Sequence, residues 1–253
     1  MSVMKFHERI SVSNNASIHA MIWKPQSSKV EKCVIFSHGF SVSGYESRRF
    51  FLDIAERLVE RNIMCVLFDY RGSGYSDWDF SEMTINTEME DLDAVISYVK
   101  GKYATDLKIT VWGMSFGSGV ASLVTSKRND VDSLLLWCLS ADLYNRYKKR
   151  FGEDIFSKGY SYTDRAQKVT LAFLNSLKEV DVFDSYKNIT CPILFVHGDD
   201  DPTAAVDLSL KAYELANQPK QIEIIHGGNH GFKLQDALFD TAIEKSLLWL
   251  KNQ

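Results

Sequence analysis

Residues 109–117 read ITVWGMSFG, an apolar run that ends in the pattern G-x-S-x-G, and a helical pattern begins at Phe116. A tight turn from a strand into a helix forces its central residue into a strained backbone and projects the side chain. Glycines on either side, here Gly113 and Gly117, remove side chains that would collide across such a turn. The helix N-terminus also carries partial positive charge beside the serine hydroxyl. We therefore predict that Ser115 is a nucleophile; a chance glycine-rich turn is the alternative.

Short apolar segments alternate with helical patterns on both sides of this turn. The predicted strands are Phe6–Ser13, Ser17–Trp23, Cys33–Ser37, Ile63–Asp69, Leu107–Trp112, Ser133–Leu139, Ile193–His197 and Gln221–His226. Helices are predicted around residues 50–59, 85–99, 116–127, 204–216 and 235–251, the second with a capping box of Thr87 and Glu90. The central strands are apolar on both faces, as in a parallel sheet covered by helices. This alternation predicts an α/β protein with a mostly parallel, doubly wound central sheet and helices on both faces.

A long segment after the sixth predicted strand interrupts this alternation, and it is rich in aromatic and charged side chains. An unstructured loop of about 50 residues would be unusual inside a compact domain. Helical spacing from Val169 to Val180 predicts a helix within the segment. We expect residues 141–187 to form a small inserted cap that covers Ser115 and sets substrate choice, within a single domain of residues 1–253.

A serine hydroxyl needs a base to remove its proton, and three histidines follow Ser115 in the chain: His197, His226 and His230. His226 ends a predicted strand, whereas His230 lies in a glycine-rich loop from which it can reach across the carboxyl edge of the sheet. We therefore select His230 as the base. The acid that orients it should follow the penultimate strand, where residues 199–201 are all aspartates. Spacing alone leaves all three open.

Four motifs in succession resemble those of the α/β-hydrolase superfamily, and the likeness covers nearly the whole chain. They are residues 37–40 (SHGF), 69–76 (DYRGSGYS), 113–117 (GMSFG) and 197–201 (HGDDD). The chain is most similar to small-cap bacterial carboxylesterases, including feruloyl esterase-like and monoglyceride lipase-like members. It departs from the lipases at Met114, where they often carry histidine. The resemblance implies the α/β-hydrolase fold.

The resemblance also assigns roles to individual residues. It implies that Asp201, rather than Asp199, is the triad acid, and that the backbone N–H groups of Phe40 and Phe116 are the oxyanion donors. Asp69 and Arg71 would tie loops together near the site. The implied activity is hydrolysis of a carboxylic ester through an acyl-enzyme intermediate, with thioester hydrolysis or acyl transfer as the alternative. The implied catalytic residues are Ser115, His230 and Asp201. A binding protein on an inactive scaffold is a rival of another class.

Composition limits the partners and the location that we expect. The net charge is −4, and phosphate binding needs concentrated positive charge, so a nucleic-acid partner is not expected. The chain lacks a signal-like N-terminus and an apolar run of membrane length. We therefore expect a cytoplasmic protein without stable membrane insertion that acts on a small-molecule ester or thioester. We expect no cofactor and no metal, because neither a dinucleotide fingerprint nor metal-ligand spacing is visible. Four cysteines are predicted to be reduced core residues: Cys33, Cys65, Cys138 and Cys191.

A basic cluster, residues 146–150 (RYKKR), opens the predicted cap. It is either a solvated helix face or a site that recognises a carboxylate or phosphate on the substrate. The aromatic residues of the cap are likewise either packing residues or a platform for the substrate.

Overall fold

The computed structural model describes residues 3–26, 29–103 and 106–253. Its central sheet has eight strands in the order β1-β2-β4-β3-β5-β6-β9-β10. Their bounds are β1 (Val3–Ser11), β2 (Ser17–Pro25), β3 (Lys32–Ser37), β4 (Ile63–Phe68), β5 (Lys108–Met114), β6 (Ser133–Trp137), β9 (Ile193–Gly198) and β10 (Lys220–Ile225). Neighbouring strands from β4 to β10 are parallel, whereas β2 runs antiparallel to both β1 and β4. The predicted mostly parallel α/β sheet is confirmed, and all the predicted strands belong to it.

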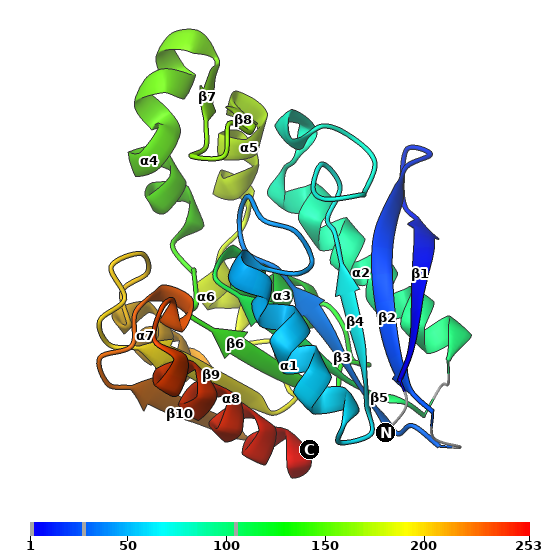
Figure 1. Cartoon of the computed structure of the whole chain (residues 1–253). Coiled ribbons are helices and arrows are strands. Elements are labelled where there is room, and N and C mark those ends of the chain that lie inside the picture. The colour runs from blue at the N-terminus through cyan, green and yellow to red at the C-terminus, as the bar shows by residue number, and fades with distance from the viewer. Residues whose placement is uncertain (1–2, 27–28, 104–105) are drawn as a thin grey trace.

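Helices cover both faces of the sheet (Figure 1). On one face lie α1 (Phe50–Val59) and α8 (Asp236–Lys251); on the other lie α2 (Ile85–Lys102), α3 (Phe116–Thr125), α6 (Val182–Ser185) and α7 (Asp207–Leu215). The sheet divides the core into two, because successive side chains of a strand point to opposite faces. In β3, for example, Val34 packs with α1 and Ile35 packs with α2 and α3. Burial on both faces explains why the central strands are continuously apolar.

The start of α2 differs from the prediction. Its N-cap is Thr84, whose hydroxyl accepts a hydrogen bond from the N–H of Thr87 at 3.2 Å, and the Thr87 hydroxyl accepts from the N–H of Thr84 at 2.9 Å. The capping box predicted at Thr87 and Glu90 is therefore wrong. The Glu90 carboxylate instead lies 2.8 Å from both Arg71 Nη2 and Ser13 Oγ, which belong to distant segments of the chain.

The segment between β6 and β9 leaves the sheet at the carboxyl end of β6 and rises away from it (Figure 1). It contains α4 (Leu143–Lys158), the hairpin of β7 (Tyr160–Tyr162) and β8 (Lys168–Thr170), and α5 (Leu171–Ser176). The helix predicted from Val169 to Val180 is shorter than expected, because Val169 pairs with Ser161 in the hairpin. The hairpin was not predicted, since its strands are only three residues long and carry too little periodicity.

The fold bears on two further predictions, one about the cysteines and one about membrane-spanning helices. All four cysteines are free; Cys33, Cys65 and Cys138 are buried, and Cys191 is half-buried. The predicted core position is confirmed for Cys33, Cys65 and Cys138, whereas Cys191 packs only at the edge of the core, and the reduced state stays a prediction. Within the described ranges, no helix combines the length and the apolar character needed to cross a membrane.

Candidate active site

Ser115 occupies the turn between β5 and α3, in a rarely populated backbone conformation with φ 54° and ψ −119°. The turn is tight: a Cβ on Gly113 would lie 2.5 Å from Cα of Ser118, and one on Gly117 would lie 2.2 Å from the carbonyl oxygen of Ser37. Only glycine permits such close approaches. Strained residues of this kind cost on the order of 1–3 kcal/mol and cluster at functional sites. The predicted strand–turn–helix context of Ser115 is therefore present.

Three side chains from distant parts of the sequence form one chain of hydrogen bonds. Oγ of Ser115 lies 2.9 Å from Nε2 of His230, and Nδ1 of His230 lies 2.7 Å from Oδ2 of Asp201. Ser115 follows β5, Asp201 follows β9 and His230 follows β10, so all three stand at the carboxyl edge of the sheet. The structure thus brings together the serine, histidine and aspartate selected from the sequence, and their catalytic roles stay a prediction.

Several donors converge on the Asp201 carboxylate. Its Oδ1 accepts hydrogen bonds from the N–H groups of Thr203 and Ala204, at 2.8 and 2.9 Å. Its Oδ2 contacts Nδ1 of His230 and also lies 3.2 Å from Nε2 of His197. Burial disfavours the charged form, but the hydrogen bonds from His197 and His230 outweigh it, so the pKa of Asp201 is lowered. The carboxylate is therefore charged at neutral pH and suited to hold the imidazole N–H of His230.

The two neighbouring aspartates have other partners. Oδ2 of Asp199 lies 2.7 Å from Nδ1 of His226, and Oδ1 of Asp199 accepts a hydrogen bond from the N–H of Gly227 at 2.7 Å. Asp200 is exposed to solvent. Asp199 therefore closes the turns that follow β9 and β10, and His226, one of the candidate bases, belongs to that turn contact.

His197 contributes to the site in a way that the sequence did not predict. The ring is fully buried, with Nδ1 2.6 Å from Oγ of Ser209 and Nε2 2.9 Å from the carbonyl oxygen of Ala204. These contacts fix the ring beside Asp201. A signal for this arrangement exists, because His197 and Asp201 are four residues apart at the end of one strand, so their side chains can meet in the same turn.

Two backbone N–H groups beside the serine lack hydrogen-bond partners among the described residues: those of Phe40 and Phe116. The two rings pack edge to face at 5.7 Å, so the residues are neighbours. Glu46 holds the Phe40 loop by accepting a hydrogen bond from the N–H of Gly39. His38 is buried and bonds the Gly39 carbonyl at 2.8 Å, and burial lowers the pKa of His38, which favours its neutral form. Unpaired donors in this position suit an oxyanion hole, a role that stays a prediction.

Similarity to known proteins agrees with this geometry. The family described as serine aminopeptidase, S33, matches residues 28–153. The α/β hydrolase GrgF from Penicillium sp. sh18 superposes with a TM-score of 0.82 at 16% identity, covering 100% of this chain and 99% of that one. Est1E from Butyrivibrio proteoclasticus, solved with ferulic acid, superposes with a TM-score of 0.83 at 20% identity, covering 96% of this chain and 99% of that one. The chain has the α/β-hydrolase fold.

Two curated relatives match this chain over part of their own length. The quorum-quenching protein AidA of Acinetobacter baumannii is 26% identical over 132 residues, which are 51% of this chain and 42% of AidA. The lysophosphatidylserine lipase ABHD12 of Danio rerio is 29% identical over 187 residues, which are 70% of this chain and 44% of the lipase. The chain thus spans less than half the length of these relatives.

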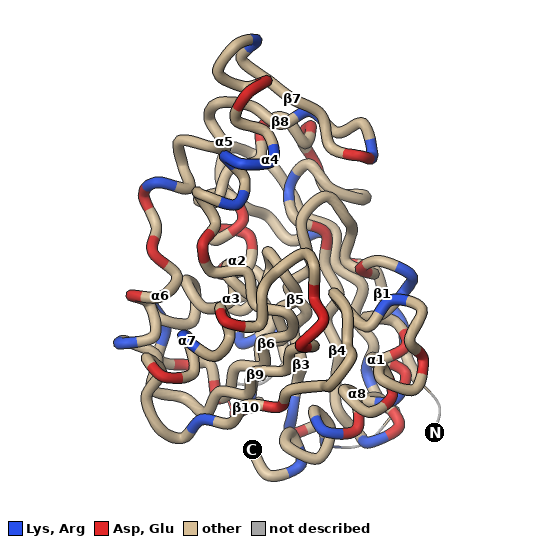
Figure 2. Tube along the Cα trace, turned by 90° about the vertical axis from the view of Figure 1, so that its left-hand side faces the viewer, with Lys and Arg blue, Asp and Glu red and all other residues tan. Residues whose placement is uncertain are grey.

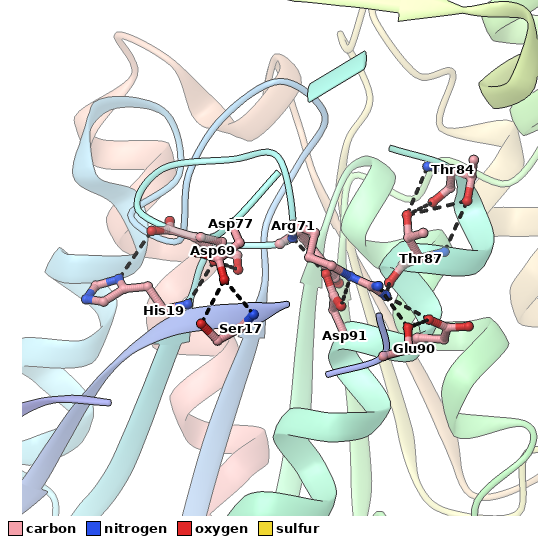
Figure 3. A network of polar contacts seen from close by, with 12 residues as sticks. Ser17, His19, Asp69, Arg71, Asp77, Thr84, Thr87, Glu90 and Asp91 are labelled. Atoms are coloured by element: carbon pink, nitrogen blue, oxygen red, sulfur yellow. Dashed lines mark hydrogen bonds and ion pairs between the residues drawn. The ribbon is translucent and has the colours of Figure 1, made fainter. Parts of the chain in front are cut away.

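The segment after β4 joins loops through buried polar contacts (Figure 3). Asp69 accepts hydrogen bonds from the N–H groups of Gly44 at 2.7 Å and Tyr75 at 2.9 Å. Arg71 is buried, and both its backbone N–H and its Nε donate to Asp91 at 2.7 Å. These contacts explain the D-x-R-G-x-G-x-S motif as structural support for the loops beside the site.

A hollow of about 160 Å³ opens at Ser115. The segment between β6 and β9 forms part of its wall, with Arg146 and Tyr147 from α4 and Arg165 from the β7–β8 turn. Larger hollows include two, of about 500 and 660 Å³, around Lys32 at the amino ends of the strands, and one of about 690 Å³ between Leu143 and Lys211. We place the chemistry in the hollow at Ser115, because both Ser115 and His230 line it and ligands of open α/β sheets bind at the carboxyl ends of the strands.

Cys138 lies directly beside the histidine loop. Its Sγ accepts a hydrogen bond from the N–H of Gly231 at 3.3 Å, and burial raises the pKa of the thiol, with the Asp201 charge adding to the effect. Ligand atoms of Cys138, Asp201 and His230 lie within 4.8 Å of one another. We assign no metal to this group, because the aspartate and the histidine already bond to each other. The sequence predicted only a core position for Cys138. A signal for its place near Ser115 exists, because Cys138 directly follows β6 and β6 is the neighbour of β5.

Proposed function

We propose that this chain is a serine hydrolase that cleaves a carboxylic ester through an acyl-enzyme intermediate. The observation that carries the proposal is the hydrogen-bonded chain from Ser115 through His230 to Asp201, at the mouth of a hollow. A serine hydroxyl is a weak nucleophile by itself. A histidine base held by a carboxylate is the arrangement that activates it.

In the proposed reaction, Nε2 of His230 takes the hydroxyl proton as Oγ of Ser115 attacks the acyl carbon. The carbonyl oxygen becomes negative and accepts hydrogen bonds from the N–H groups of Phe40 and Phe116. Collapse of this intermediate breaks the ester C–O bond, and His230 gives its proton to the leaving alcohol. Water then attacks the acyl-enzyme in the same way and releases the acid and free Ser115. Throughout, Asp201 keeps the Nδ1 proton in place and stabilises the imidazolium.

The relatives support an ester as the substrate class. One is a lysophosphatidylserine lipase, and Est1E was solved with ferulic acid. We therefore propose a small-molecule ester as the substrate of this chain. Thioester hydrolysis and acyl transfer would use the same residues, and they differ only in the leaving group or in the acceptor that replaces water.

We also propose that residues 141–187 act as a cap on a single domain of residues 1–253. The support is that Arg146 and Tyr147 of α4 line the hollow at Ser115. A cap in this position would limit which substrates reach the serine. A cytoplasmic location is proposed from the free cysteines, because reduced thiols are typical of that compartment.

The proposed function is tested by covalent labelling with a fluorophosphonate, which bonds to an activated serine. We expect one probe on the peptide that contains Ser115 of the folded chain, and none on Ser115→Ala or on the heat-denatured chain, measured by intact and peptide mass spectrometry. Turnover is then compared for a butyrate oxygen ester and a butyrate thioester, each with and without an added alcohol. This comparison separates ester hydrolysis, thioester hydrolysis and acyl transfer to the alcohol. A folded wild-type chain that neither labels nor cleaves any ester would contradict the proposal.

A further inference from the structure

We propose that the substrate carries an anionic group, a carboxylate or a phosphate, which binds basic side chains in the hollow at Ser115. This inference rests on the proposed function of that site. Four basic side chains line the hollow and form what we call the anion-binding cluster: Arg146, Arg150, Arg165 and Lys233. Only two acidic side chains, Glu46 and Asp164, line it with them. The hollow is therefore positive, in a chain whose net charge is −4.

The two acidic side chains neutralise little of this charge. Glu46 accepts hydrogen bonds from the backbone N–H groups of Gly39 and Ser47, so it is already engaged by its own loop. Asp164 pairs with Arg150 at 3.1 Å, but its side chain is 92% exposed, where such a pair is weak. No ion pair among the described residues engages the other three members of the cluster: Arg146, Arg165 and Lys233.

Four arginines elsewhere in the chain are ion-paired: Arg71 and Arg128 with two carboxylates each, and Arg9 and Arg57 with one each. Other arginines outside the cluster have no carboxylate partner among the described residues, so the lack of an ion pair does not by itself distinguish Arg146 and Arg165. These two differ in their position, because they line a hollow that also contains the candidate nucleophile. There they can bind an anion, because the planar guanidinium group matches a carboxylate or phosphate with two parallel hydrogen bonds.

The cluster is held in a fixed position relative to the serine. Arg146 and Arg150 are four residues apart on α4, so they lie on one face of the helix, and Figure 2 shows basic positions along it. Tyr147, between them, packs on the ring of Phe40 at 4.7 Å and on the ring of Phe116 at 5.5 Å. These are the residues whose N–H groups are proposed to hold the oxyanion. The helix that carries the arginines is therefore packed directly on the proposed oxyanion hole.

The hollow suits a short charged group better than a long apolar chain. Its volume is about 160 Å³. Phe151 and Phe173, from α4 and α5, are buried against Phe40 and Tyr147 and do not line it. These two aromatic residues therefore act in packing, whereas Tyr147 lines the hollow. The anion should lie a few bonds from the scissile carbonyl, since both must fit into the same small space.

The test uses three 4-nitrophenyl esters of similar length: a hemiglutarate, its neutral methyl ester and a 4-phosphonobutyrate. We expect kcat/KM for one of the anionic esters to exceed that of the neutral ester by about 10- to 100-fold, as for charge-assisted hydrogen bonds. Arg146→Gln should lower this ratio by about 10-fold. Lys149→Gln is the matched control, because it removes the same charge from an exposed position of the same helix outside the hollow, and it should leave the ratio unchanged.

The outcomes separate this inference from the proposed function. If Ser115 labels and the neutral ester is cleaved, but the ratio stays near one, the anion-binding cluster is only a solvated surface and the inference is wrong while the function stands. Equal losses in Arg146→Gln and Lys149→Gln would also overturn it, because they indicate a long-range charge effect. If Arg146→Gln fails to fold, Arg165→Gln replaces it, since Arg165 is exposed on the β7–β8 turn. The carboxylate and phosphonate esters distinguish the two kinds of anion. Failure of labelling and of all turnover removes the proposed function and this inference together.

Discussion

Two buried aspartates of this molecule hold basic partners in different ways. Asp91 accepts two hydrogen bonds at 2.7 Å from Arg71, whose remaining donors bond Ser13, Thr87 and Glu90 (Figure 3). Asp201 bonds one nitrogen of His230, and the other nitrogen reaches Ser115 at the hollow. The first network is closed on itself, whereas the second ends at a hydroxyl that a substrate can reach.

This difference shows which of the two buried polar networks can accept a proton during a reaction. Arginine stays charged at all ordinary pH values and has no lone pair to accept a proton, so the Arg71 network can only hold segments together. Histidine can accept a proton at Nε2 while Nδ1 stays bonded to the carboxylate. Substitutions in the two networks should therefore affect different quantities, namely stability for the Arg71 network and activity for the His230 network.

The largest expected effect is that of Ser115→Ala. Removing the hydroxyl leaves His230 without a nucleophile, so ester turnover should fall by several orders of magnitude, up to about 10⁶-fold by analogy with the serine protease series. The urea unfolding midpoint should change little, because the side chain makes one hydrogen bond, to His230. Steady-state kinetics and unfolding curves test both parts. A purified variant that retains more than a few per cent of the activity would remove Ser115 from the mechanism.

Asp201→Asn should come next, with a loss of about 10⁴-fold in kcat, because an amide can present a donor to Nδ1 and favour the wrong tautomer of His230. Asp200→Asn should cost little, since that side chain is exposed. Asp199→Asn should lower stability through its contacts to His226 and Gly227 while sparing most of the activity. The three variants are compared at equal folded concentration. The assignment of the acid is wrong if Asp199→Asn is the crippling change and Asp201→Asn is nearly silent.

Arg71→Met, in the closed network, should lower stability and leave activity nearly unchanged. It leaves the Asp91 carboxylate buried without its partner, so the free energy of unfolding should fall by about 3–5 kcal/mol. Activity per folded molecule should stay close to that of the wild type, since Arg71 does not line the hollow. The control is Arg57→Met, whose half-exposed pair with Asp240 should contribute about 1 kcal/mol or less. A loss of kcat without a loss of stability would show that the two networks are not separate.

The smallest effect concerns pH, and its sign differs between the two aspartates. Burial raises the pKa of Asp91 from its ordinary 3.8 to about 6, although Arg71 opposes the shift. The folded state therefore keeps the Asp91 proton longer than the unfolded chain, and this group lowers the free energy of unfolding as the pH rises from about 4 to about 6, by about 3 kcal/mol. Asp201 has the opposite sign: its lowered pKa contributes stability above its ordinary value, which is lost as the pH falls through the folded-state pKa.

Carboxyl carbon NMR titration of the folded chain measures both groups separately. We expect the Asp91 signal to move near pH 6 and the Asp201 signal to stay at its ionised position down to below pH 4. Glu88 should resemble Asp91, because burial and the nearby Asp91 charge raise its pKa as well. An Asp91 signal that titrates at or below its ordinary value would show that the Arg71 pair, rather than burial, controls this carboxylate.

The sequence by itself determined the elements of the sheet and the nucleophile turn. Continuous apolar runs such as residues 193–197 need cover on both faces, and helical spacing in segments such as 85–99 supplies that cover. Both patterns are local, so they can be read without knowing which strands are neighbours. The glycines around Ser115 are equally informative, because the tight approaches to Ser37 and Ser118 depend on the missing Cβ atoms.

Tertiary structure alone decided the contacts between side chains that are far apart in the chain. From spacing, three adjacent aspartates were equivalent, and only the family resemblance favoured Asp201; in the folded chain, it is the one that contacts His230. Glu90, predicted to close a capping box with Thr87, is instead bound by Arg71, a residue of another segment. The positive hollow at Ser115 likewise forms from residues of five separate segments, namely 39–47, 114–115, 146–165, 203 and 230–233. Such contacts depend on the distances between segments after folding, which no local periodicity encodes.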